Sequence, residues 1–371
     1  MPALFTFDGA NGNDARLLTI VDDFLISEAK GTAIADATIA ALRERFGEVK
    51  AEHEPTSFAG YRIARDREAG TLTISMPQKA VEAAREHAPT LIDGGKLDVP
   101  TGAKLMAMAD KLEMPEHTPG ARLDATQTST QRIIGACKFM EKVNPRLCLP
   151  LHRLSCVMSF PPPDAHTVAL ATLALAYKHR DVGITYGGPG GDDSARLSGV
   201  LNSNLLDEPA PAALESSADA TWGDRLLYGL QLTYGRGAVA HMTKKIGLIL
   251  DSSMEAEGVA SSKAGEVDTY AREILRALGV PAQQPTIIMT DNKANLQVAN
   301  NSSAATRSRH FLRRYWALQQ RISRGDVKLV KADDAWMPAD YLTKWVGRAK
   351  VNQSVAYATN SRNAVRAAAV R

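Results

Sequence analysis

Between residues 214 and 350 the spacing of apolar residues alternates between the strand period and the helix period, and this alternation restricts the possible folds. Residues 214–221, 226–235 and 237–250 favour three consecutive strands, the last two joined through Gly235 and Gly237. From Met254 the spacing becomes helical and ends at Gly279 and Pro281. Further predicted elements follow as a strand at 286–290, a helix at 311–322, a strand at 327–332 and a helix at 339–346. Such an order predicts a mixed α/β sheet with flanking helices.

Four acidic residues lie on or beside four different elements of this predicted order. Asp219 lies on the first strand, Glu257 on the first helix, Asp291 after the fourth strand and Asp340 at the start of the last helix. Two hard cations roughly 4 Å apart need several carboxylates on separate rigid elements. Oxygen-only ligands favour Mg²⁺ or Mn²⁺ over Zn²⁺. The pattern therefore predicts a site for two such ions.

Each acid also has a purely structural interpretation. Asp219 can be a solvated acid at a strand end, and Asp291 can cap the following helix. Asp340 follows Pro338 and can favour the helix dipole. Glu255 competes with Glu257 for the position on the helix.

The preceding residues fall into regions of different pattern. Residues 1–100 favour two hairpins, the first with Asp22 and Asp23 at its tip, and residues 101–187 are helical in pattern. Glycine and short polar residues at 188–213 indicate a linker. The predicted division is 1–100, 101–187, the linker 188–213, 214–350, and a frayed or disordered basic tail at 351–371.

Composition adds limits of its own. Lysine and arginine total 44 against 41 acids, so the net charge of +3 favours a polyanionic partner only weakly. No apolar run approaches 18 residues, and the N-terminus has no secretory pattern, so we expect no membrane partner and a cytoplasmic or nuclear location. Without CxxC spacing, Cys137, Cys148 and Cys156 indicate reduced core thiols.

Several motifs resemble the C-terminal part of a copia-type LTR retrotransposon polyprotein. TIVDDFLI is similar to the reverse transcriptase motif with paired aspartates, and FAGYRIARDREAGTLTISMPQK is similar to the next hairpin. RIIGACKFM and AYKHRDVGITYGG are similar to thumb-like helices. The ribonuclease H portion matches in order through SADATWGD, SSMEAEGVA, TDNKA, TRSRHFLRRYW and PADYLTKWV.

This resemblance implies the fold and part of the chemistry. The expected fold is α/β, a ribonuclease H-like mixed sheet with flanking helices, preceded by a partial reverse transcriptase palm hairpin and a helical thumb-like region. The family motif favours Glu257 over Glu255 as the metal ligand. It also matches His310 to a histidine for proton transfer or product release, although a lone histidine is as often structural.

The chain also departs from the family pattern. Gly258 follows the helix glutamate where the family usually has an aromatic residue, and glycine lowers helix propensity by about 1 kcal/mol. Trp345 stands in place of a proline. Only 21 residues precede Asp22, so we expect Asp22 and Asp23 to be vestigial polymerase residues and DNA polymerase activity to be absent from this chain alone.

Two functions remain open from the sequence. The first is a metal-dependent ribonuclease H that cuts the RNA strand of RNA:DNA hybrids. A basic set would grip the phosphates, unless it is only a solvated surface: Lys244, Lys245, Arg307, Arg309, Arg313 and Arg314. The second is a catalytically silent retroelement remnant that at most binds nucleic acid or other retroelement proteins.

Overall fold

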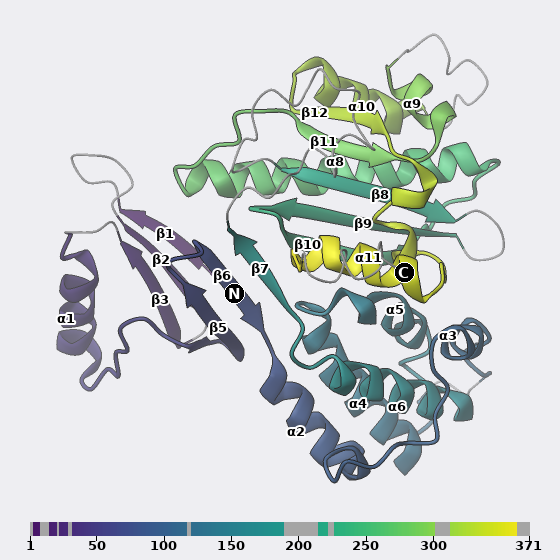
Figure 1. The fold of residues 1–371 in the computed structure, drawn as a ribbon, viewed down its shortest axis with the longest axis horizontal. Helices are drawn as coiled ribbons and strands as arrows, with labels where there is room; N and C mark the ends of the chain where they lie inside the picture. Colours follow the sequence, from purple (N-terminus) through teal and green to yellow (C-terminus); the bar gives the residue numbers. More distant parts are fainter. Residues whose placement is uncertain are drawn as a thin grey trace.

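Figure 1 shows the fold of the chain in a computed structural model. The structure describes residues 3–7, 15–20, 22–28, 32–116, 120–188, 214–221, 226–300 and 312–361. Within these ranges the strands form three separate sheets. None of the helices described combines the length and the apolar character needed to cross a bilayer.

The C-terminal sheet has five strands: β8 (Glu215–Thr221), β9 (Leu227–Tyr234), β10 (Gly237–Lys245), β11 (Thr286–Thr290) and β12 (Val327–Lys331). Their order is β10-β9-β8-β11-β12. The first three run antiparallel as a meander, whereas β11 lies parallel to both β8 and β12. This mixed sheet with flanking helices confirms the predicted ribonuclease H-like fold class.

Three helices share a hydrophobic core with this sheet: α8 (Ser253–Ala277), α9 (Lys293–Asn300) and α10 (Leu312–Ser323). The Ser252 side chain accepts the first-turn N–H of Glu255 and so begins α8, and Gly279 follows its end with φ 73°. Ala256, Ala260 and Ala264 are buried against the apolar residues of one sheet face. Small side chains at this spacing allow α8 to lie close along the sheet (Figure 1).

The other face of the sheet is covered by short turns and a last helix: η5 (Asp334–Trp336), η6 (Asp340–Leu342) and α11 (Arg348–Thr359). Alternation along β11 sends Ile288 to the α8 side and Met289 to this side, where Met289 packs in one cluster with Val355. The predicted helix at 339–346 is thus wrong in length. It is a single 3₁₀ turn, and a new helix starts only after Gly347, whose φ of 82° breaks the helical path.

The expectation of a frayed or disordered tail from 351 is wrong for residues 351–359. These residues complete α11, whose Val355, Ala356 and Ala358 are buried. Ala358 packs with Ile184 and Ala238, which belong to two different sheets. Residues 351–359 carry no charged side chain, and their buried apolar positions decide this packing.

A helical bundle extends across the predicted boundary at residue 100, because α2 packs with the later helices. Its elements are α2 (Pro77–His87), η1 (Pro89–Leu91), α3 (Ala103–Asp110), α4 (Ala125–Glu141), η2 (Pro145–Leu147), α5 (Cys148–Cys156) and α6 (Pro163–Lys178). Asp124 and Gln127 form a capping box that begins α4. All three cysteines are free. Cys137 and Cys148 are buried as expected, but Cys156 is exposed, which corrects its prediction as a core thiol.

The N-terminal elements form two smaller sheets: β1 (Ala3–Phe7), β2 (Ala15–Ile20) and β3 (Asp23–Glu28) in one, and β4 (Ser57–Phe58), β5 (Tyr61–Asp66), β6 (Thr71–Ser75) and β7 (Gly183–Gly187) in the other. Helix α1 (Ile34–Phe46) follows the first sheet. Both predicted hairpins are present, as β2–β3 and β5–β6. Strand β7 pairs with β6, so residues from the first two regions share one sheet.

Candidate metal centre

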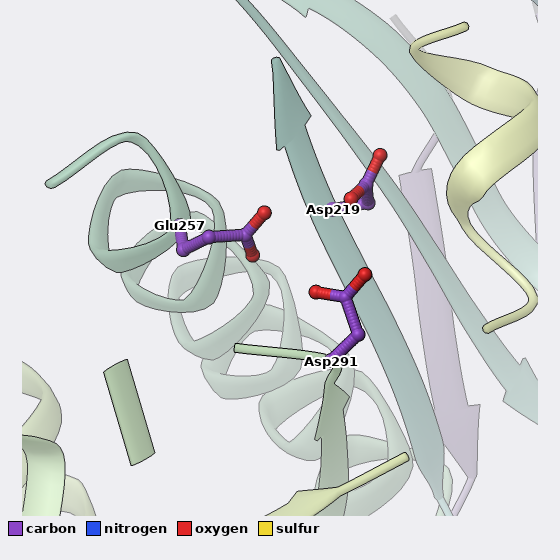
Figure 2. A group of neighbouring side chains, drawn as sticks. All are labelled: Asp219, Glu257 and Asp291. Atoms are coloured by element: carbon purple, nitrogen blue, oxygen red, sulfur yellow. The ribbon is translucent and has the colours of Figure 1, made fainter. Parts of the chain in front are cut away.

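Three carboxylates meet where the C-terminal ends of β8 and β11 lie beside α8. Asp219 comes from β8, Glu257 from the second turn of α8, and Asp291 directly follows β11. One oxygen of each lies within 4.8 Å of the others, and Figure 2 shows the three side chains converging. Parallel pairing of β8 with β11 brings the two strand ends together, because Met289 is paired with Ser217 two residues before the acids. We call these three residues the acid group.

Burial makes the acid group costly without a cation. Asp219 is 1% exposed and Glu257 5% exposed. The hydroxyl of Thr343 donates to Asp219 Oδ2, and the N–H of Ala220 donates to Glu257 Oε1 at 3.1 Å. Glu257 Oε2 is buried and has no hydrogen-bond donor among the described residues. An anionic oxygen in that state requires a proton or a cation.

The electrostatics agree with this requirement. Burial, with the charges of Asp219 and Asp291, raises the pKa of Glu257 to about 9. Burial also raises the pKa of Asp219 to about 6, opposed by Lys344 and reinforced by Asp340. For Asp291 the pKa is raised by burial and by Asp340. A bound divalent cation would relieve this repulsion, so the acid group can bind a metal ion.

The fourth predicted ligand, Asp340, is buried beside the acid group but is not a member of it. Its Oδ1 lies 3.2 Å from Lys344 Nζ, and its Oδ2 forms an ion pair with Lys350. Lys344 Nζ is also 3.6 Å from Asp219 Oδ1. Asp340 therefore faces the acid group across a lysine ammonium.

The structure decides two of the structural interpretations, with Glu255 serving the start of α8 and Asn292 rather than Asp291 capping α9. Glu255 Oε2 accepts the N–H of Asp251, so this glutamate serves the start of α8 and leaves Glu257 in the pocket. At α9, it is Asn292 Oδ1, and not Asp291, that accepts the N–H of Asn295. The helix containing Gly258 is continuous from Ser253 to Ala277, with Gly258 buried.

Asn295, which no sequence motif indicated, connects the elements that position the acid group. Its side-chain amide donates to Ser261 Oγ of α8 at 2.8 Å and to Thr290 Oγ1, just before Asp291, at 3.2 Å. The hydroxyl of Tyr315 on α10 donates to Asn295 Oδ1 at 3.0 Å. The available signal was a polar residue three positions before Val298, on the buried side of α9.

Gly229 and Thr343 were also missed. Gly229 pairs with Asp219 across β8 and β9, and a Cβ on Gly229 would lie 2.5 Å from Leu342 Cβ. The glycine therefore permits η6 and Thr343 to approach the strand beside Asp219. The one sequence signal was a glycine inside a predicted strand.

The remaining predicted residues lie elsewhere. Lys244 and Lys245 are exposed at the end of β10. His310, Arg307 and Arg309 lie outside the described residues, and Arg313 and Arg314 lie on α10 with side chains outside the description. Asp22 and Asp23 are exposed at the turn between β2 and β3.

Comparison with known proteins gives relatives of one kind. No family model matches the chain. It is 24% identical over 338 residues to the retrovirus-related Pol polyprotein from transposon RE2 of Arabidopsis thaliana, covering 90% of this chain and 21% of the relative. The RE1 polyprotein of the same plant is 24% identical over 339 residues, with the same two coverages. The transposon TNT 1-94 polyprotein of Nicotiana tabacum is 27% identical over 122 residues, covering 33% of this chain and 9% of the relative.

These relatives confirm the predicted kinship with retrotransposon polyproteins, and the chain spans about a fifth of the length of the two Arabidopsis proteins. Among solved structures, RNase H1 from Halobacterium salinarum NRC-1 is 18% identical with a TM-score of 0.28, covering 35% of this chain and 93% of that one. The foamy viral protease-reverse transcriptase in complex with RNA/DNA hybrid is 10% identical with a TM-score of 0.32, covering 90% and 42%. The fold of this chain is defined by its own strand order.

Proposed function

We propose that this chain, a relative of the Pol polyproteins of plant retrotransposons, is a metal-dependent endoribonuclease of the ribonuclease H type. Its substrate would be the RNA strand of an RNA:DNA hybrid. The observation that supports this most is the convergence of Asp219 on β8, Glu257 on α8 and Asp291 after β11, within 4.8 Å of one another in a ribonuclease H-like fold.

The donor set suits Mg²⁺ or Mn²⁺, because every ligand is a carboxylate oxygen and Glu257 Oε2 lacks any other partner among the described residues. We propose two ions held by Asp219, Glu257, Asp291 and Asp340. Ions bound there would supply a more nucleophilic water for attack on the phosphodiester and positive charge for the departing 3′ oxygen. The expected products carry a 5′ phosphate and a 3′ hydroxyl.

The chain's own residues would hold this centre in place. Thr343 orients one oxygen of Asp219, and the Ala220 N–H orients one oxygen of Glu257. Asn295 fixes α8 relative to the end of β11. A ligand held by a second group loses less freedom on binding, so these contacts would favour metal binding.

Basic residues of the sequence would bind the substrate. We propose that Lys244, Lys245, Arg307, Arg309, Arg313 and Arg314 contact hybrid phosphates, and that His310 assists proton transfer or product release. Recognition of a 2′ hydroxyl on the cut strand would separate RNA from DNA.

We also propose the wider organisation given by the sequence: a partial palm at 1–100, a thumb-like region at 101–187, a linker at 188–213 and the nuclease at 214–350. Asp22 and Asp23 would be vestigial polymerase residues, and a cytoplasmic or nuclear location and contacts with other retroelement proteins belong to the same proposal. The relatives' full polyproteins are several times longer than this chain.

The test is cleavage of labelled RNA by the purified full chain. A 5′-labelled RNA is annealed to DNA or to RNA, and each duplex is incubated with Mg²⁺, Mn²⁺ or EDTA. We expect cleavage of RNA in the RNA:DNA hybrid and not in the RNA duplex, and only when a divalent ion is present. Asp219→Asn should abolish this cleavage, whereas Asp22→Asn should retain it. Folded protein that binds the hybrid without cutting it would overturn the enzyme and leave the silent nucleic-acid binder.

A further inference from the structure

Two lysines from the segment that follows β12 contact Asp340, and one of them, Lys344, also reaches Asp219 of the acid group. Lys344 Nζ lies between two buried carboxylates, 3.2 Å from Asp340 Oδ1 and 3.6 Å from Asp219 Oδ1. Lys350, in the first turn of α11, forms an ion pair with Asp340 Oδ2 and donates to the backbone oxygen of Asp334. Asp340 therefore has an ammonium group at each oxygen.

The backbone that presents Lys344 is firmly anchored. Thr243 Oγ1 on β10 donates to the Leu342 oxygen at 2.6 Å, and the N–H of Lys344 donates to the Asp340 oxygen at 3.1 Å. The absence of a side chain at Gly229 allows this close approach. By contrast, the Lys344 side chain is 44% exposed. Its ammonium group can therefore turn away from the carboxylates into solvent without unfolding of the backbone.

Charge balance gives this arrangement a consequence. Ionised Asp219, Glu257, Asp291 and Asp340 carry four negative charges, and the two ammonium groups cancel half of them. The two negative charges that remain are balanced by one divalent cation. A second divalent cation is balanced only if ammonium groups leave the pocket, since like charges at such short range repel strongly.

We propose that Lys344 and Lys350 are built-in counter-ions of Asp340, so that the free pocket binds one divalent cation at Asp219, Glu257 and Asp291 and admits a second only when Lys344 is displaced. This inference rests on the proposed function, because it concerns how the same centre is loaded. The lysines would thereby hold Asp340 buried and in place before the second ion binds.

The test counts bound Mn²⁺ on the full chain without nucleic acid, by the loss of the free-ion EPR signal during titration. We expect the unmodified chain to bind one ion tightly and a second far more weakly. In Lys344→Met the second ion binds about tenfold more tightly, a value reduced for the half-exposed side chain. Lys350→Met shifts it less, because Lys350 contacts Asp340 alone among the acids of the pocket.

A matched control is Lys79→Met, because Lys79 is 45% exposed and pairs with Glu82 on α2. It should leave both affinities unchanged. Equal affinities for the second ion in the unmodified chain and in Lys344→Met would overturn the lysine proposal alone. Absence of any tight ion in every variant would overturn the proposed function as well. Thermal melting of each variant checks folding, and Lys344→Gln replaces Lys344→Met should the latter melt early.

Discussion

The chain has acidic residues in two contrasting settings. Asp22 and Asp23 are adjacent in the sequence and exposed, Asp22 in the turn before β3 and Asp23 as the first residue of β3. Asp219, Glu257 and Asp291 are separated by more than thirty residues each, yet their oxygens meet within 4.8 Å, with Asp219 and Glu257 buried. Acids adjacent in the sequence thus form no buried cluster here. The mixed sheet and the helix packed on it bring distant acids together instead.

The difference teaches where a cation is needed. Charges in water are screened, so the exposed aspartates are stable as they stand. Buried carboxylates that repel one another are stable only with protons, ammonium groups or metal ions. In the acid group, Asp219 has the Lys344 ammonium beside it, and the pKa of Glu257 is raised to about 9. The contrast can be tested with substitutions at both places.

The largest difference is expected in cleavage. Asp219→Asn should lower the rate on an RNA:DNA hybrid by more than about 100-fold, since loss of even a group that supports a metal ligand costs about 10- to 100-fold. Asp23→Asn should leave the rate unchanged. Single-turnover cleavage with saturating protein measures both. Similar losses at the two sites would contradict the contrast.

The next effect is on stability against pH without divalent ions. The pKa of Glu257 is about 9 in the folded chain against an ordinary 4.5, because of burial and the charges of Asp219 and Asp291. The folded state therefore keeps a proton that the unfolded state loses, so the free energy of unfolding falls as pH rises between about 4.5 and 9. Asp219 adds a smaller fall in the lower part of this range.

Urea unfolding in EDTA across that pH range measures the slope. Glu257→Gln should flatten it, and Asp22→Asn should not alter it. Mn²⁺ should stabilise the chain more at high pH, because the metal binds the deprotonated acids. A slope that is unchanged in Glu257→Gln would show that another group is responsible.

A smaller effect is expected from Asn295. Replacement by alanine removes donors to Ser261 and Thr290 and leaves the Tyr315 hydroxyl without that acceptor. We expect a loss of about 1–3 kcal/mol in the free energy of unfolding. Mn²⁺ affinity should fall about tenfold. Asn295→Asp, which keeps the shape of the side chain and its acceptor oxygen, is the comparison variant. An unchanged Mn²⁺ affinity in Asn295→Ala would show that Asn295 contributes to stability and not to metal binding.

The smallest effect belongs to the hairpin itself. Asp22→Asn and Asp23→Asn should each change the free energy of unfolding by less than about 0.5 kcal/mol, because both side chains are exposed. Chemical denaturation with and without Mn²⁺ measures this. A metal-dependent change in either variant would show that the hairpin aspartates bind an ion after all.

Local periodicity was sufficient to predict the strands and helices that position the acid group. The strand period of 286–290 and the helical spacing after Met254 are properties of adjacent residues, and they correspond to β11 and α8. The order of the motifs then indicated which acids were candidate metal ligands.

Contacts between distant segments could not be predicted in this way. The approach of Leu342 to Gly229, the lysines beside Asp340 and the hub at Asn295 depend on tertiary packing, which no local period encodes. The same limit explains the overlong helix at 339–346 and the unpredicted pairing of β7 with β6.

The most direct measurement is a crystal of the full chain soaked in Mn²⁺ and recorded with anomalous scattering. We predict an anomalous peak within ligand distance of Asp219, Glu257 and Asp291, absent from Asp219→Asn crystals, and no peak at Asp22 and Asp23. An acid group that stays empty at saturating Mn²⁺, or a peak at the hairpin instead, would contradict the account.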